Sequence, residues 1–194
     1  MRPVNKGKCE LPVRHVPEVE HIEAKAKGGG LTDWDNLLLS CKYCNTRKGT
    51  KAAKGDRGKY LWPDEDDTFH PYQYSSGAPQ INEAFLADQD KTYSERAKRL
   101  FALVGLGNRP SYKEKDRRFL ARNEAYNHAL LSKEGWDKVG EGKDKEIYLE
   151  LMIRLAQSTG FFSSWMEVFK DDEEVKKALI QGFRGTRESV FEKR

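Results

Sequence analysis

Cys41 and Cys44, two cysteines separated by two residues, constrain the local fold more than any other feature of this 194-residue chain. Two thiolates on one tight turn can share a tetrahedral zinc ion, and the same spacing occurs in redox motifs. A redox pair would need a βαβ frame around it, and the neighbouring sequence does not show one. The spacing therefore favours a zinc knuckle. Of the about four ligands that a structural zinc needs, Cys9 can be a third, and the fourth is not evident.

The residues around the two cysteines have the pattern strand, loop, strand, helix. The β-prone segment VEHI covers 19–22, and the glycine-rich turn KGGG covers 27–30. The apolar run DNLLLSC follows at 35–41, and NTRKGTK at 45–51 reads as the start of a helix. Such a unit is too small to have a large core of its own, so a metal staple would be a sensible way to stabilise it.

The composition indicates a soluble globular protein on the polar side. Hydrophobic residues make up 37% of the chain and charged residues 34%. No apolar run approaches the about 20 residues that span a bilayer, and the first residues, MRPVNKGKCELPV, lack the apolar core of a signal peptide. Three cysteines without an export signal also argue against a disulfide framework. We therefore expect a cytoplasmic protein.

From about residue 83 the apolar residues recur at helical spacing. Amphipathic segments begin near residues 83, 111 and 144, and the third has an apolar face formed by Ile147, Leu151, Met152 and Leu155. Asp171 and Asp172 can cap a last helix, whose apolar residues are Val175, Leu179 and Phe183. The sequence therefore predicts an α+β fold. A small ββα-metal unit with a zinc knuckle occupies 1–75, and a mostly α-helical domain occupies 76–194.

Two apolar stretches each allow two interpretations. The aromatic residues of 60–82 could stack on bases, but their density favours packing against the first unit; they are Tyr60, Trp62, Phe69, Tyr72 and Tyr74. The segment GFFSSWMEVF at 160–169 would suit a partner-docking face and a helical core equally well.

Basic residues are concentrated directly after the cysteines. Between Asn45 and Tyr60 the only acidic residue is Asp56, and the basic residues are Arg47, Lys48, Lys51, Lys54, Arg57 and Lys59. A charge run by itself is usually a solvated loop. Beside candidate catalytic residues, it indicates a polyanionic partner.

Hard metal ligands and a base lie in the same window. Glu20 and His21 are adjacent on the first predicted strand, and Asn45 lies at the start of the predicted helix. Carboxylate and amide oxygens suit Mg²⁺ or Mn²⁺ better than they suit a thiolate-binding metal. A neutral imidazole beside such an ion can take a proton from water. The window therefore favours metal-assisted hydrolysis.

The motifs EH, DNLLLSC and CKYCNTRKG resemble the signature of HNH nucleases in its His-Asn-Asn variant. The similarity extends over most of the chain, through MRPVNKG, CELP, VEHI, WDNLLLSCKYCN, KYLWPDEDDTF and GFFSSWMEVFKDDEEVKKALIQGFRGT. In order and spacing, these segments resemble PtuB, the family of HNH nucleases in Septu antiphage systems that also occurs beside some retrons.

The resemblance implies a role for each residue that matches the nuclease motif. His21 corresponds to the general base, and Glu20 to the acidic metal ligand before it. Asn45 corresponds to the residue that closes the Mg²⁺ or Mn²⁺ site. Asn36 corresponds to the middle asparagine of the catalytic set, which holds the loop and orients the base.

The same resemblance assigns the cysteines. Cys41 and Cys44 correspond to the second zinc knuckle, and Cys9 to the last cysteine of the first knuckle. The remaining cysteine of that first knuckle would stand at position 6, where this chain has Lys6. His15 is the residue that would substitute for it.

The implied activity is metal-dependent hydrolysis of phosphodiester bonds in DNA, or in tRNA, during antiphage defence. Arg47, Lys48 and Lys51 would grip the nucleic-acid backbone. The implied partner is a PtuA-type ABC/SMC-like ATPase that docks on the helical half, and a retron reverse transcriptase with its RNA and DNA is a further one. The alternative is a catalytically silent zinc-knuckle module that only binds nucleic acid or protein.

Overall fold

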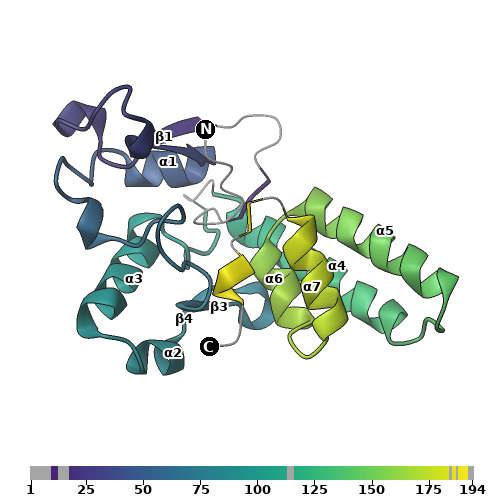
Figure 1. Ribbon diagram of the computed structural model, residues 1–194. Coiled ribbons are helices and arrows are strands. Elements are labelled where there is room, and N and C mark those ends of the chain that lie inside the picture. Colours follow the sequence, from purple (N-terminus) through teal and green to yellow (C-terminus); the bar gives the residue numbers. More distant parts are fainter. Residues whose placement is uncertain (1–9, 13–17, 113–115, 184, 187, 192–194) are drawn as a thin grey trace.

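Two short antiparallel strands and a helix form the first unit of the fold (Figure 1). The computed structural model describes residues 10–12, 18–112, 116–183, 185–186 and 188–191. Strand β1 (Glu18–His21) pairs with β2 (Leu37–Ser40), with Glu20 opposite Leu38, and helix α1 (Lys42–Lys48) follows directly. The predicted order of strand, loop, strand and helix is therefore confirmed.

Helix α1 begins at Lys42, earlier than the predicted start at Asn45. Cys41 is its N-cap, because the Cys41 Sγ accepts a hydrogen bond from the backbone N–H of Cys44 at 3.4 Å. A cap of this kind satisfies one of the free N–H groups of the first helical turn. Both cysteines are buried in the first hydrophobic cluster.

The chain after α1 completes the first hydrophobic cluster. Strand β3 (Tyr72–Gln73) pairs with β4 (Gln80–Ile81), and helices α2 (Glu83–Ala87) and α3 (Lys91–Leu103) follow. Trp62, Tyr72 and Tyr74 are at most 5% exposed, which confirms that these aromatic residues pack in the core. The cluster joins Ile22 of the first unit to Leu100 of α3. It therefore crosses the boundary predicted at residues 75/76.

Four helices surround a second hydrophobic cluster. They are α4 (Arg118–Trp136), α5 (Lys143–Thr159), α6 (Phe162–Val168) and α7 (Glu173–Gly182), and Figure 1 shows them gathered on one side of the molecule. Phe162, Trp165 and Phe169 are at most 2% exposed, so the segment 160–169 is core and not a docking face. The predicted cap of the last helix is confirmed, since Asp172 Oδ1 accepts from the backbone N–H of Val175 at 2.9 Å.

The described residues thus form two small sheets and a larger set of helices, which agrees with the predicted α+β class. No helix among them has the length and apolar character needed to cross a bilayer.

The predicted apolar face of α5 is only partly buried. Met152 is 3% exposed, but Ile147, Leu151 and Leu155 are 47%, 60% and 37% exposed. These three residues lie along one side of α5, whereas the helix packs into the cluster through Met152 and Ala156, one helix position further round.

Arg122 of α4 lies between the two hydrophobic clusters. It is 1% exposed, and its guanidinium lies over the ring of Phe161 at 5.2 Å and over that of Tyr74 at 5.9 Å. Within the described part of the chain, none of its three guanidinium nitrogens has a hydrogen-bond partner. Two cation–π contacts offset only part of the cost of burying a charge that arginine cannot lose.

We therefore expect Arg122→Met to stabilise the protein by about 1–4 kcal/mol, because a buried charge is replaced by an apolar side chain of similar length. Urea unfolding of the full chain measures the effect. Arg117→Met is the matched control, since Arg117 is an exposed neighbour and its replacement should leave the midpoint unchanged. A lower midpoint for Arg122→Met would contradict this account of the buried guanidinium.

Candidate active site

The carboxylates of Glu18 and Glu20 project from the same face of β1, because alternate residues of a strand share a face. Helix α1 packs along the strand. Asn45 Nδ2 donates a hydrogen bond to Glu18 Oε2 at 2.8 Å. The structure therefore pairs Asn45 with Glu18, two residues before the carboxylate that the sequence predicted.

Glu20 lies against Lys48 instead. Its side chain is fully buried, and its Oε1 is 3.9 Å from the Lys48 Nζ. Lys48 is 1% exposed and also donates to the backbone carbonyl oxygen of His21 at 2.5 Å. The prediction that Lys48 grips nucleic acid does not fit this position, because the ammonium group is buried behind the strand that carries His21.

Asn36 fastens the loop between the two strands. Its Oδ1 accepts from the backbone N–H of Glu23 at 2.7 Å, and its Nδ2 donates to the carbonyl oxygens of Glu23 at 3.0 Å and Gly30 at 2.9 Å. A Cβ at Gly29 would collide with the Glu23 carbonyl oxygen, which explains one of the three consecutive glycines. The loop is therefore held at both ends by one buried amide.

His21 is oriented by that loop. Its Nε2 lies 3.0 Å from the carbonyl oxygen of Leu31, next to the Gly30 that Asn36 holds. A carbonyl oxygen only accepts, so Nε2 carries the proton and Nδ1 is the basic nitrogen. Asn36 thus holds Gly30, the residue before the one whose carbonyl oxygen bonds His21; its predicted orienting role stays a prediction.

The donor set of this face suits a hard divalent ion. Glu18 and Glu20 offer carboxylate oxygens, and Asn45 offers an amide oxygen once its side chain turns over. Among the residues that the structure describes, no three His, Cys, Asp or Glu side chains converge into a preformed metal centre. Glu18 was missed in the sequence because it is separated from His21, although its alternate position on the strand could have indicated it.

These positions give different expectations for the two carboxylates. Glu18→Gln should weaken Mn²⁺ binding and leave the unfolding midpoint unchanged, since Glu18 is only half-buried beside Asn45. Glu20→Gln should destabilise the fold by about 3 kcal/mol or more, because it leaves the buried Lys48 without its counter-ion. Calorimetric Mn²⁺ titration and urea unfolding measure the two effects. Weaker Mn²⁺ binding in Glu20→Gln, together with an unchanged unfolding midpoint, would instead favour Glu20 as the main metal ligand.

Most of the basic residues after the cysteines are already paired. Arg47 contacts Asp116 at 3.3 Å, Arg57 contacts Asp64 at 2.7 Å and Glu65 at 2.6 Å, and Lys59 contacts Asp56 at 2.7 Å. Lys51 and Lys54 are exposed, and neither has an acidic partner among the described residues. The exposed positive charge of this run is therefore concentrated on these two lysines.

The cysteine turn contacts the helical half. Arg118 Nη1 at the start of α4 donates to Cys44 Sγ at 3.1 Å, and Arg118 is 2% exposed. Cys41, the other cysteine of the turn, is the N-cap of α1. Cys9, the third predicted ligand, lies outside the described residues, as do Lys6 and His15.

Asp116 joins α1 to α4 at a second point. Its carboxylate accepts from Arg118 Nη2 at 2.6 Å and from Arg47 Nε at 3.3 Å. Burial opposes the charge of Asp116, but the hydrogen bonds and positive charges of Arg118 and Arg47 outweigh it and hold the pKa of Asp116 below its ordinary value. Helix α1, which carries Asn45, is therefore anchored through two residues of the helical half.

The segment that carries these residues is similar to a known protein family. Residues 7–51 match the HNH endonuclease family. This segment contains β1, the loop held by Asn36, β2 and α1. No curated protein and no solved structure matches the chain.

Proposed function

We propose that this chain, which contains an HNH endonuclease segment at 7–51, is a Mg²⁺- or Mn²⁺-dependent endonuclease. The observation that carries the proposal is the connected set Asn36, Gly30, Leu31 and His21, because it presents an imidazole with a defined basic nitrogen. The Glu18–Asn45 pair lies three residues before His21, on the opposite face of the same strand.

In the proposed reaction, His21 Nδ1 takes a proton from a water molecule in line with the scissile bond. Leu31 stabilises the resulting imidazolium, because its carbonyl oxygen continues to accept from Nε2. Glu18 and Asn45 are the residues that would hold the ion, while Glu20, the ligand predicted from the sequence, lies buried against Lys48 on the same face of the strand. When bound, the ion supplies charge neutralisation at the phosphate and the leaving oxygen.

Nucleic-acid binding is expected to depend on the exposed lysines. Lys51→Glu with Lys54→Glu should weaken binding of DNA or RNA about tenfold or more and make the salt dependence shallower, because fewer counterions are released. Filter binding across a salt series measures both changes. Lys177→Glu on α7 is the matched control and should change neither. Equal affinity of the double variant and the parent would remove these lysines from the interface.

A cleavage assay tests the proposed activity directly. Labelled plasmid and total tRNA are incubated with the purified chain, with and without a PtuA-type ATPase, in Mg²⁺ and in EDTA. We expect cleavage in Mg²⁺ only, and the substrate that is cut distinguishes DNA from tRNA. Binding without cleavage in every condition would favour the alternative, a silent module that only binds nucleic acid or protein.

The antiphage role and the ATPase partner extend the proposal through the resemblance to the PtuB family. We place the ATPase contact on the α4–α7 half, because the nuclease motif lies wholly in the first unit. A retron reverse transcriptase with its nucleic acid belongs to the same set of proposed partners. Co-purification of the co-expressed proteins tests each association.

Structural zinc at the cysteine turn is a further part of the proposal. Cys41 and Cys44 would hold it, since two buried thiols on one turn fit thiolate coordination, and Cys9 would be the third ligand. The Arg118 guanidinium is compatible with a thiolate at Cys44, because a charged donor favours an anionic acceptor. Measuring the zinc content of the purified protein tests whether these cysteines bind zinc. Zinc content well below about half an equivalent would contradict this part.

A further inference from the structure

Helix α5 has apolar side chains around most of its circumference. Met152 and Ala156 are buried in the second cluster. One edge of the helix faces α7, and the opposite edge carries Ile147, Leu151 and Leu155, which we call the outer face of α5. A helix that serves only one interface needs apolar residues on one side. The outer face therefore indicates a second interface.

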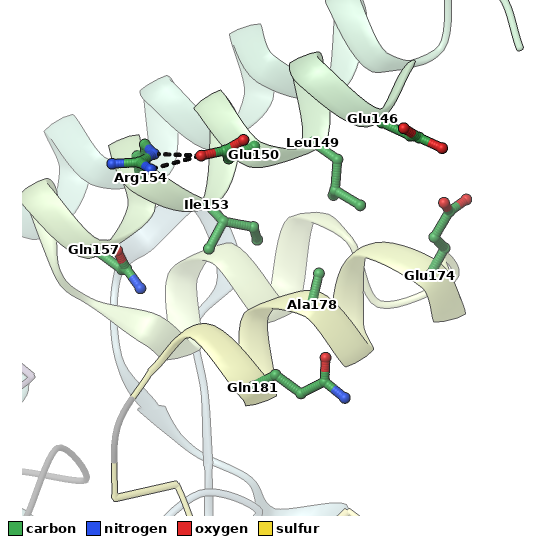
Figure 2. A pocket seen from close by; sticks show the side chains of 9 residues that line it. All are labelled: Glu146, Leu149, Glu150, Ile153, Arg154, Gln157, Glu174, Ala178 and Gln181. Carbon is green, nitrogen blue, oxygen red and sulfur yellow. Dashed lines mark hydrogen bonds and ion pairs between the residues drawn. The ribbon is translucent and has the colours of Figure 1, made fainter. Parts of the chain in front are cut away.

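The α7 edge is already occupied. Figure 2 shows Leu149 and Ile153 pointing from α5 toward Ala178 of α7, where a groove of about 520 Å³ remains between the helices. Gln157 Nε2 donates to the carbonyl oxygen of Gly182 at 2.6 Å and closes one end. This side of α5 therefore packs against α7 of the same chain. The outer face points away from α7.

The outer face is a continuous apolar strip. Its three residues are spaced four apart, so they follow one another along the same side of the helix. They are 47%, 60% and 37% exposed, and Leu131 of α4 is 68% exposed. Leu131 precedes Ser132, whose carbonyl oxygen accepts from Tyr148 Oη at 3.1 Å, so this exposed leucine lies on a turn of α4 that contacts α5.

Charged residues border this strip in a self-complementary order. Glu150 and Arg154 form an ion pair at 2.6 Å on α5, and both side chains are more than 60% exposed (Figure 2). In an antiparallel pair of α5 helices centred on Leu151, Ile147 of each copy faces Leu155 of the other. Arg154 then lies about 3 Å along the axis from Glu150 of the other copy, within reach of its side chain.

We propose that the outer face of α5 binds a second copy of this chain in an antiparallel, two-fold symmetric contact. A two-fold contact brings the same patch of both copies together, which requires self-complementary charge of the kind that Glu150 and Arg154 provide. Three apolar side chains per copy form a contact smaller than the about 800 Å² per partner of stable complexes. The dimer therefore dissociates on dilution. This inference is independent of the proposed nuclease activity.

Sedimentation of the full chain over a wide concentration range tests the apolar part. We expect the parent to change from monomer to dimer, and Leu151→Glu to weaken the association at least tenfold. Leu130→Glu is the matched control. Leu130 is 42% exposed but lies about 200° around α4 from Ser132, on the side away from α5. A parent that stays monomeric, or a Leu151→Glu variant that dimerises normally, would overturn the proposal.

A charge exchange tests the geometry. Glu150→Arg alone and Arg154→Glu alone should each weaken the dimer, because like charges then meet across the two-fold axis. The double variant should restore it, because each new charge again faces its opposite. Failure of this rescue would contradict the antiparallel register. Loss of ATPase co-purification in Leu151→Glu with a monomeric parent would assign the face to the ATPase instead and overturn self-association.

Discussion

Replacing His21 with alanine is expected to lower the rate of phosphodiester cleavage by about 10²- to 10⁴-fold, the usual contribution of a general base. The side chain is half-exposed, and its hydrogen bond to the Leu31 carbonyl oxygen orients the ring without supporting the core. The unfolding midpoint and nucleic-acid affinity should therefore stay close to those of the parent. Single-turnover cleavage of the preferred substrate in Mg²⁺ measures the loss.

Two comparisons separate this role from a general disturbance. His70→Ala is the matched control, because His70 is bonded to Asp67 at 2.7 Å, away from the site, and its removal should leave the cleavage rate unchanged. Added imidazole should restore part of the His21→Ala rate, since a small base can enter the vacated space. A variant that cuts at the parent's rate would remove His21 from the mechanism.

The second large effect is expected at the contact between α1 and α4. Arg118→Ala removes a buried guanidinium that bonds Asp116, the Val104 carbonyl oxygen at 2.7 Å and Cys44 Sγ. Breaking a buried charge pair in this way costs about 3–5 kcal/mol. Urea unfolding measures the loss. Arg117→Ala should be neutral because Arg117 is exposed. A small loss at Arg118 would mean that α1 does not depend on α4.

The Asp116 carboxylate gives this contact a pH dependence. Its pKa is held below the ordinary value, so its contribution is complete above that value and is lost as the pH falls through the lowered pKa. We expect stability to fall below about pH 4 and Asp116→Asn to show a smaller fall over the same range. Thermal unfolding between neutral pH and acid measures the difference. Identical acid profiles would contradict the assignment.

The local order of the first unit could be predicted, but the pairing of its charges could not. The segment VEHI, the three glycines and the cysteine turn indicated strand, loop and helix, and the 7–51 match to the HNH family agrees with the motif. The choice of Glu18 over Glu20 beside Asn45 depends on how α1 lies along β1. Lys48 lies three residues after Asn45, on the same inner face of α1. In the sequence, Lys48 stands in a run of basic residues, and this run gave no sign that the Lys48 side chain is buried.

In the second half, periodicity identified the helices but not their neighbours. The pattern around Met152 fits several orientations of α5, because apolar residues occur on more than one side of the helix. Packing against α4 and α7 selected one orientation and left Leu151 exposed. The cap at Asp172 was predictable because it depends only on the residues next to it.

The first hydrophobic cluster decides which piece of this chain could be exchanged between proteins. A graft of residues 1–75 would carry the nuclease motif but leave behind Leu100, Leu103 and the rest of α3, against which that motif packs. It would also leave Asp116 and Arg118, which anchor the helix carrying Asn45. A functional chimera therefore has to keep at least the residues up to Arg118 from the same parent as the motif. Natural recombination that preserves activity should respect the same limit.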